Sequence, residues 1–261
     1  MHQRRILLEH AHNLRDLGGF PTEGGLVTKW NLLYRSDSLS ELTEAEWQVL
    51  YGLNINCILD LRSDQEVKDA PICPTYPVES HHLSLMKELD EVPMVRMEDL
   101  AKMDKDDELT KQILKSMELD YPRTLFGNLT CAASILEAIL NKLKKGDGSV
   151  LFLCSAGKDR TGITAAMLLY LCGVPREDII ADYMVSYTYN EKGINQMLSE
   201  IPKEVKDLFD SDSARQGMSS DPETMAGLLD VFEEKDLRKC LAENGFDAKK
   251  QQELADLITE S

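Results

Sequence analysis

The chain has 261 residues, and its 29 Lys and Arg against 46 Asp and Glu give a formal net charge of −17 at pH 7. A protein this acidic lacks the basic surface of a nucleic-acid binder, and an anionic membrane would repel it. With 43% hydrophobic and 29% charged residues, the composition is that of a soluble globular protein. We therefore expect no nucleic-acid partner and no stable membrane attachment.

The cysteines and the apolar stretches point to an intracellular compartment. Six cysteines without a CxxC pair are too sparse for a disulfide scaffold and indicate free thiols, of which Cys57, Cys131 and Cys172 are expected in the core. The N-terminus has no apolar run long enough for a signal peptide, and the most apolar stretch, 163–174, is too short to span a bilayer. We expect a cytoplasmic protein, although non-standard secretion would leave no such trace.

The first third of the chain is predicted to be α/β. Short apolar runs have the pattern of buried strands and lie at 32–35, 56–61 and 78–85. Between the first two runs, the capping box Thr43–Glu46 opens a helix that is expected to end near Tyr51. Three prolines exclude a long helix before the third run: Pro71, Pro74 and Pro77.

The remainder is predicted to be helical around one further strand, the fully apolar run Val150–Leu153. Apolar periodicity and capping residues predict helices at 121–143, 161–172 and 177–191, one opened by Asp221-Pro222, one closed by Gly245 and one capped by Asp247. The Met-rich, charged segment 87–120 is expected to form inserted helices. They are either a solvated decoration or a lid over an active site.

The segment Cys154–Gly162 carries the chemistry. Cys154 is a candidate nucleophile at the end of the apolar strand, and Arg160 follows after five residues, where a helix begins. Backbone N–H groups of such a loop and the positive end of the helix can hold a tetrahedral oxyanion, and Gly157 allows the tight curl. The planar fork of Arg160 can grip two phosphate oxygens, and these positive groups favour a thiolate at Cys154. The pattern therefore predicts a phosphate-binding nucleophile site.

Two competing interpretations of the segment Cys154–Gly162 are weaker. A buried cysteine before an ordinary strand–helix turn would match Cys-x5-Arg by chance, but Gly157 and Thr161-Gly162 between an apolar strand and an apolar helix argue against chance. A nucleotide-binding loop needs G-x-x-x-x-G-K-[ST]. That pattern is excluded because Phe152 stands where its first glycine belongs and Asp159 follows Lys158.

The segment Cys154–Gly162 resembles the active-site loop of the cysteine-dependent phosphatases, and Lys158-Asp159 before Arg160 is similar to the atypical bacterial tyrosine/lipid phosphatases. Three segments closer to the N-terminus resemble motifs of the same family: 13–19, 33–36 and 59–63. The arrangement of predicted helices from about 221 onward is also similar. The resemblance implies one phosphatase domain over 1–261 with a cysteine-phosphatase-like α/β fold. It would have a small, largely parallel central sheet flanked by helices, a helical insertion at about 87–120, and a helical C-terminal part.

The resemblance also implies roles within the loop. Cys154 would attack phosphorus and form a phosphocysteine, while Arg160 and the loop amides would hold the non-bridging oxygens. The implied phosphate-binding set is Ser155, Ala156, Gly157, Lys158, Asp159 and Arg160. Lys158 would add positive charge for phosphoinositides or multiply phosphorylated substrates, unless it is a solvated surface lysine. Thr161 would donate to the thiolate and ease its departure.

The leaving group needs a proton from a general acid. The resemblance offers Asp159, favoured because it is nearest, and Asp60, which could instead position Arg160 or Lys158 or cap amides at its strand end. Two arginines are expected either to support the site or to form buried structural pairs: Arg35 and Arg62.

One position departs from the family pattern, because Leu153 precedes Cys154 where the family usually has His. Leucine cannot form a hydrogen bond, so a looser loop and a less favoured thiolate are expected. The sequence thus predicts a phosphomonoester hydrolase of the tyrosine phosphatase type, with dual specificity or phosphoinositide activity open. The alternative is a weakly active or inactive pseudophosphatase that binds phosphorylated ligands, and a sulfur- or arsenate-handling enzyme is a more distant third.

No metal and no cofactor are expected, because the phosphocysteine route needs none. His81 and His82 are neighbours on a predicted strand, so their side chains point to opposite faces and do not share one ion. The expected partner is a phosphorylated protein or a small phosphate ester, since the acidic average disfavours an insoluble anionic lipid.

Overall fold

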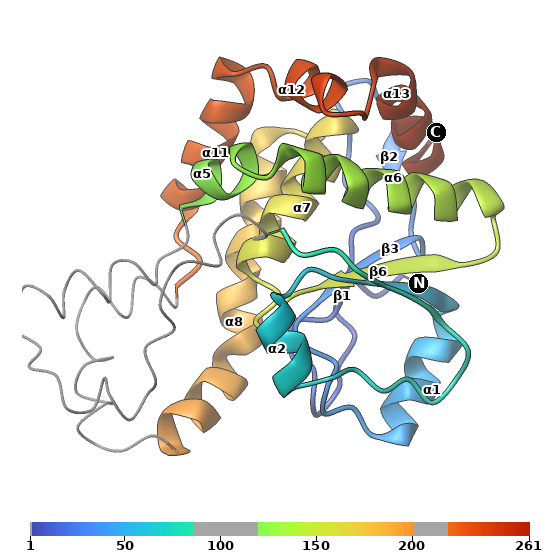
Figure 1. The fold of residues 1–261 in the computed structure, drawn as a ribbon, viewed down its shortest axis with the longest axis vertical. Coiled ribbons are helices and arrows are strands. Elements are labelled where there is room, and N and C mark those ends of the chain that lie inside the picture. The colour runs from blue at the N-terminus through green and yellow to red at the C-terminus, as the bar shows by residue number, and fades with distance from the viewer. Residues whose placement is uncertain (1, 86–119, 201–218) are drawn as a thin grey trace, which may run out of the picture.

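The computed structural model describes residues 2–85, 120–200 and 219–261, so the predicted insertion at 87–120 lies outside the described residues except for Asp120. At the centre is a five-stranded sheet (Figure 1). Its strands, in spatial order, are β1 (Arg15–Asp16), β3 (Leu33–Ser36), β6 (Ser149–Leu153), β4 (Ile55–Asp60) and β5 (Glu79–His82). The strands predicted from the apolar runs are therefore confirmed, with bounds shifted by one to three residues.

The sheet is largely parallel, as predicted. β6 pairs in parallel with β3 and β4, and β4 pairs in parallel with β5, whereas β1 runs antiparallel to β3. Every residue of β6 is buried, which is why the strand continues after Ser149 as the unbroken apolar run Val150–Leu153. In register, Leu153 stands opposite Ser36 on one side and Asp60 on the other. The carboxyl ends of three strands thus meet where the chain continues into Cys154.

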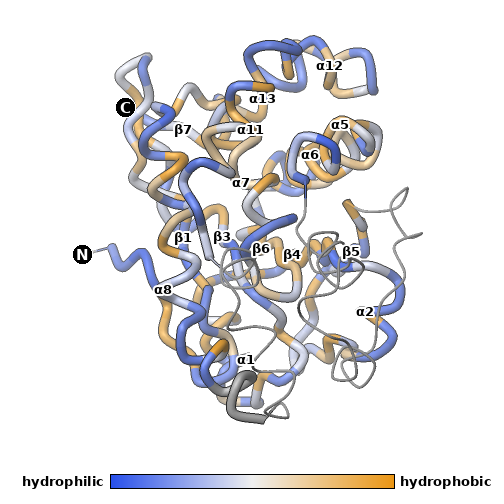
Figure 2. The backbone as a smooth tube through the Cα atoms, turned by 90° about the vertical axis from the view of Figure 1, so that its left-hand side faces the viewer, coloured by the Kyte–Doolittle hydropathy of each residue, from blue (hydrophilic) through white to orange (hydrophobic). Residues whose placement is uncertain are grey.

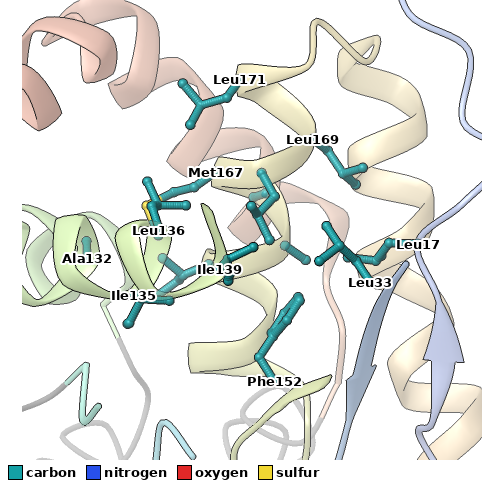
Figure 3. Close-up of a cluster of buried hydrophobic side chains, with 14 of the residues drawn as sticks. Leu17, Leu33, Ala132, Ile135, Leu136, Ile139, Phe152, Met167, Leu169 and Leu171 are labelled. Atoms are coloured by element: carbon teal, nitrogen blue, oxygen red, sulfur yellow. The ribbon is translucent and has the colours of Figure 1, made fainter. Parts of the chain in front are cut away.

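Alternate side chains of the strands enter two hydrophobic clusters. Val150 and Phe152 pack on one face of the sheet with α6 (Leu129–Lys145) and α7 (Asp159–Leu171) (Figure 3). Leu151 and Leu153 face the opposite cluster, which contains residues of α1 (Glu44–Gly52). Figure 2 shows hydrophobic residues in the central strands β4 and β6, whereas the peripheral α2 (Asp64–Asp69) is largely hydrophilic.

A further layer of helices covers α6 and α7 (Figure 1). It consists of α11 (Pro222–Glu234), α12 (Leu237–Glu243) and α13 (Ala248–Ile258), while α8 (Arg176–Glu200) packs beside α7. The predicted caps are confirmed: Thr43 and Glu46 form a capping box at α1, Asp221 caps α11 and Asp247 caps α13. The helical C-terminal part therefore completes the core on the side of the sheet that α6 covers.

The helix predicted over 121–143 is wrong in one respect, because the chain forms two helices there, α5 (Tyr121–Phe126) and α6. Gly127 ends α5, and a Cβ at this position would lie 2.8 Å from the Arg123 carbonyl oxygen. The Asn128 side chain then donates to the Thr124 carbonyl at 2.8 Å and draws the chain out of the helical path. Apolar periodicity persists across the break, so the pattern alone did not reveal it.

Short elements also escaped prediction. The six residues of α2 show too little periodicity to be recognised, and so do the two-residue strands β2 (Val27–Thr28) and β7 (Thr259–Glu260), which pair with each other. All six cysteines are free and Cys57 is buried, but Cys131 and Cys172 are only partly buried, which corrects the expectation for these two. None of the described helices is both long and apolar enough to cross a membrane.

Candidate active site

Cys154 directly follows β6, and α7 begins at Asp159, so the loop 154–160 joins the central strand to a buried helix. The helix starts two residues earlier than predicted. Cys154 is 1% exposed and lies at the carboxyl edge of the sheet. The Leu61 amide donates to the Leu153 carbonyl at 2.8 Å, which ties the last residue of β6 to the chain leaving β4. The predicted nucleophile therefore sits on a rigid strand end.

The backbone of the loop is held from outside through its carbonyl groups. The Ser155 carbonyl accepts from the Ser38 amide at 3.0 Å. The Ala156 carbonyl accepts from the side chains of Asn13 at 3.0 Å and Asn190 at 2.8 Å. The Gly157 carbonyl accepts from the side chains of Asn13 at 3.0 Å and Arg35 at 2.7 Å. In a trans peptide the N–H points opposite to the C=O. The amides of Ala156, Gly157 and Lys158 therefore point away from these outside partners, as the predicted nest would require.

Glycine is required at position 157 for two reasons. Its φ is 63°, in the left-handed region that side-chain-bearing residues disfavour. A Cβ here would also lie 2.5 Å from the Ser36 carbonyl and the Asp37 amide. The loop thus curls directly against the end of β3.

A buried charge network stands behind the loop. Asp182 of α8 pairs with Arg15 at 2.8 Å and with Arg35 at 2.6 Å, and all three side chains are nearly inaccessible. Burial alone would raise the pKa of Asp182, but the two guanidinium charges outweigh it and hold the pKa at about 2. Arg35 combines the two expected roles, because it forms this pair and also donates to the Gly157 carbonyl.

Arg160 lies at the mouth of the loop and is held by Glu66 of α2. Its Nη1 is 2.5 Å from Oε2 and its Nη2 is 2.9 Å from Oε1, a bidentate pair in which the arginine side chain is 11% exposed. Burial would lower the pKa of Arg160, but the bond to Glu66 and the charge of a Cys154 thiolate raise it above its ordinary value. Arg160 is therefore a permanent cation at the mouth of the nucleophile loop.

The remaining predicted charges of the loop have defined partners. Tyr121 of α5 donates its hydroxyl to Asp159 at 2.6 Å, and the Tyr183 hydroxyl lies 2.9 Å from that of Tyr121. Lys158 is 8% exposed, with Nζ 3.1 Å from the Ser219 carbonyl and 3.3 Å from Asp159. The alternative of a solvated surface lysine is therefore wrong, because Lys158 is packed against the start of the C-terminal helices.

Asp60 and Arg62 pair with each other. Arg62 Nε and Nη2 lie 2.9 and 2.6 Å from the carboxylate of Asp60, and both side chains are largely buried. Arg62 also donates to Ser38 at 3.2 Å and to the Ala70 carbonyl at 2.9 Å. The Asp60 carboxylate is thus engaged by Arg62, and its suggested role in positioning Arg160 or Lys158 stays a prediction.

Neither Leu153 nor Thr161 makes a side-chain hydrogen bond among the described residues. Leu153 is fully buried in the apolar cluster that also contains Trp47 and Leu50, so its side chain fills core volume. The Thr161 hydroxyl is buried without a hydrogen-bond partner in the part of the chain that the structure describes, so the expected bond to Cys154 is not formed.

The paired histidines have ordinary partners. His81 Nε2 lies 2.9 Å from Glu79, and His82 Nε2 lies 2.7 Å from the Arg62 carbonyl. Within residues 2–85, 120–200 and 219–261, no three His, Cys, Asp or Glu side chains are grouped as metal ligands.

Four residues that shape the site were not singled out as site residues: Asn13, Glu66, Tyr121 and Asp182. Asn13 belongs to the block 13–19, so the resemblance pointed to its segment. Glu66 stands three residues after Ser63, a capping-box spacing that marks α2. Asp182 and Tyr121 look like ordinary helix residues, and only their long-range contacts reveal them.

The chain matches the tyrosine phosphatase family over residues 6–260. A candidate tyrosine-protein phosphatase of Cupriavidus necator is 29% identical over 189 residues. The match covers 71% of this chain but only 64% of that protein, which is less than two thirds of its length. The triple specificity protein phosphatase PtpB of Mycobacterium tuberculosis is 27% identical over 232 residues, 79% of this chain and 76% of that protein. The crystal structure of Pseudomonas aeruginosa TpbA covers 77% of this chain and 90% of its own, at 16% identity and a TM-score of 0.34. With a match that spans nearly its whole length, the chain belongs to the tyrosine phosphatase family.

Proposed function

We propose that the chain hydrolyses phosphomonoesters, phosphotyrosine foremost, through a phosphocysteine intermediate. The observation that supports this proposal is the loop after Cys154, whose carbonyls are held by outside partners and whose Arg160 is fixed by Glu66. Such a constellation binds a tetrahedral dianion and stabilises the charge that develops on its equatorial oxygens.

In the first step the Cys154 thiolate attacks phosphorus. The S–P bond forms as the ester P–O bond breaks, and the leaving oxygen takes a proton from the protonated carboxyl of Asp159. In the second step a water attacks phosphorus and gives its proton to the Asp159 carboxylate. The S–P bond breaks, and inorganic phosphate and the thiolate are released.

Asp159 is the better candidate for the acid because of its surroundings. It lies next to Arg160 at the start of α7, and the Tyr121 hydroxyl and Lys158 orient its carboxyl group. Both carboxylate oxygens of Asp60 accept hydrogen bonds from Arg62, so this side chain is turned toward Arg62.

The substrate class follows from the family and from the charge of the chain. The relatives are named for tyrosine or triple specificity, so phosphotyrosine is the first substrate to test and dual specificity or phosphoinositide activity the second. The net charge of −17 favours soluble phosphopeptides and small esters over an anionic lipid surface.

The decisive experiment compares the wild type with Cys154→Ser on para-nitrophenyl phosphate and a phosphotyrosine peptide. The wild type is expected to hydrolyse both, and the serine variant to lose at least about 10³-fold in kcat, because serine has no populated oxyanion near neutral pH. A trapped phosphoenzyme should carry its phosphate on Cys154. Full activity in the serine variant would disprove the phosphocysteine route.

A second candidate function rests on Leu153, which fills an apolar core position where the family usually has His. The chain would then be a pseudophosphatase that binds phosphorylated ligands without turnover. Measuring wild type and Leu153→His side by side separates the two functions. Absence of turnover in both, together with phosphopeptide binding, would favour the binding module, whereas turnover by the wild type favours the enzyme.

A further inference from the structure

Two tyrosine hydroxyls form a chain of contacts that ends on Asp159. The Tyr121 hydroxyl donates to Asp159 Oδ1 at 2.6 Å, and the Tyr183 hydroxyl lies 2.9 Å from that of Tyr121. The two rings meet edge to face with centroids 5.9 Å apart, and each tyrosine is only 2% exposed. The contact with Asp159 therefore comes from the packed interior of the molecule.

Three helices bring these residues together. Tyr121 is the first residue of α5, Tyr183 lies in α8, and Asp159 is the first residue of α7, which both other helices contact. A Cβ at Gly162, three residues after Asp159, would lie 3.3 Å from the Tyr183 ring. The missing side chain at Gly162 thus lets this ring pack against the first turn of α7, where Asp159 begins the helix.

The hydrogen bonds of the two tyrosines can run in only one direction toward a charged Asp159. Burial and then the charge of Asp159 raise the pKa of Tyr121 well above its ordinary value, and burial also raises the pKa of Tyr183. Both hydroxyls therefore keep their protons near neutral pH. A tyrosine has a single O–H, and Tyr121 gives its own to Asp159. Tyr183 is consequently the donor to Tyr121.

The contacts of the Asp159 carboxyl group are made to one of its two oxygens. Lys158 Nζ lies 3.3 Å from Oδ1, which also accepts from Tyr121. Among the described residues, Oδ2 has no hydrogen bond or ion pair, and the Asp159 side chain is 31% exposed. A proton on Oδ2 leaves both contacts in place, whereas a proton on Oδ1 would compete with them. The two oxygens are therefore not equivalent.

We propose that Tyr121, supported by Tyr183, is a positioning residue that holds Asp159 by Oδ1 so that Oδ2 delivers the proton to the leaving group, an inference that rests on the proposed phosphatase function. In the first step the Oδ2–H bond breaks as the leaving oxygen gains that proton. In the second step the attacking water gives a proton to Oδ2, and the Tyr121 hydroxyl keeps its own proton throughout. Without that hydroxyl the carboxyl group can rotate, and the proton is less often aligned with the leaving oxygen.

The test uses two esters that differ in how much the leaving oxygen needs a proton. Tyr121→Phe removes the hydroxyl and keeps the ring. On phenyl phosphate its kcat/KM is expected to fall about 10-fold, and on para-nitrophenyl phosphate, whose leaving group is a stable anion, by less than about 2-fold. Tyr183→Phe should give the same selectivity with a smaller loss, because it leaves the bond between Tyr121 and Asp159 in place.

Tyr76→Phe is the matched control. It also loses one tyrosine hydroxyl, which donates to the Ile55 carbonyl at 2.5 Å and belongs to the opposite side of the sheet, with the cluster around Trp47. This variant should keep the wild-type kcat/KM on both esters.

A double-mutant cycle provides the readout that a merely structural role would not change. In the Asp159→Asn background no acid is left to position, so Tyr121→Phe is expected to change kcat/KM on phenyl phosphate by less than about 2-fold. A structural defect would lower the rate by the same factor in both backgrounds. Circular dichroism checks the fold, and Tyr183→Phe takes the place of Tyr121→Phe in the cycle if the latter does not fold.

Four results would overturn the positioning role. These are a wild-type kcat/KM of Tyr121→Phe on phenyl phosphate, equal losses on the two esters, equal losses with and without Asp159, or the same selective loss in Tyr76→Phe. Each of them leaves the phosphatase proposal standing, because the wild type still turns over its substrate and Cys154→Ser does not. An inactive wild type or a fully active Cys154→Ser would instead reject the phosphatase proposal, and the positioning role with it.

Discussion

Two carboxylates border the nucleophile loop, and their partners differ in kind. Asp60 is paired with the guanidinium of Arg62, whereas Asp159 accepts from the hydroxyl of Tyr121 and pairs with Lys158 at 3.3 Å. The oxygens of Asp60 are therefore occupied by Arg62, while Asp159 lies beside Arg160 in the nucleophile loop. This difference in surroundings is why we propose Asp159, rather than Asp60, as the general acid.

The leaving group of the substrate tests this assignment. Asp159→Asn is expected to lower kcat by about 10²-fold or more on phenyl phosphate, whose leaving oxygen needs a proton, and much less on para-nitrophenyl phosphate. Asp60→Asn should change kcat by similar factors on both substrates, because it disturbs Arg62 rather than proton transfer. Steady-state rates on the two esters decide the matter. A selective loss on phenyl phosphate in Asp60→Asn would move the acid role to Asp60.

At the scale of elements, the loop 154–160 is shaped from outside by segments that are distant in sequence. Its carbonyls are held by the Asn13 side chain, by the end of β3 and by α8, and the loop presses so closely on β3 that position 157 has no room for a side chain. The nest is thus a property of the assembled sheet edge rather than of the loop sequence.

Glycine substitutions measure this close fit. Gly157 and Gly146 have φ of 63° and 65°, but a Cβ at Gly146 would meet no atom within 4 Å. Gly146→Ala should therefore show only the backbone cost of the left-handed region, about 1–2 kcal/mol of unfolding free energy, with unchanged kcat/KM. Gly157→Ala should lose more stability and at least about 10²-fold in kcat/KM. Urea unfolding and activity assays provide both numbers, and equal effects of the two variants would contradict the close approach to β3.

At the scale of the whole molecule, Asp182 links α8 to the N-terminal strand through Arg15 and to the sheet through Arg35, which reaches the loop. The Arg35 guanidinium is fully buried, and burial with the nearby charge of Arg15 lowers its pKa to about 10, so it stays charged at pH 7. Three charges in the interior are tolerated only as a set, because removal of one leaves the others without compensation.

This network predicts how stability depends on pH. Burial is outweighed by the two arginines, and the folded pKa of Asp182 is about 2, below its ordinary value of 3.8. The unfolded chain therefore binds the proton more readily, and the stabilisation is complete above about pH 5 and is lost as the pH falls toward 2. In Asp182→Asn, the unfolding free energy should fall less steeply as the pH drops from about 5 toward 2. At pH 7 it should lie roughly 3–5 kcal/mol below that of the wild type.

Urea unfolding between pH 7 and pH 2.5 checks this expectation. Asp147→Asn is the matched control, because Asp147 also has a lowered pKa from Lys142 but is solvent-exposed. The control should behave as the wild type. If the unfolding free energy of Asp182→Asn fell as steeply with falling pH as that of the wild type, the network would not be the source of the pH dependence.

Much of the framework could be predicted from local patterns. The apolar run Val150–Leu153 is buried on both faces, and for this reason it could be predicted as a central strand. Helix caps could be predicted because they depend on contacts within four residues, as at Thr43, Asp221 and Asp247. The placement of Cys154 and Arg160 followed from the same strand–loop–helix order. The break at Gly127 and the short α2 were not predicted, because neither interrupts or creates a clear periodicity.

By itself, the sequence determined the strand–loop–helix setting and indicated which residues to propose for the chemistry, because those features depend on neighbours along the chain. Only the tertiary structure decided what each residue touches: Glu66 on Arg160, Tyr121 on Asp159, Arg62 on Asp60, and Asp182 between two arginines. These partners are separated by up to 167 residues, apart from the local Asp60–Arg62 pair. Their pairing depends on the order and register of strands in the sheet, which no local pattern of residues encodes.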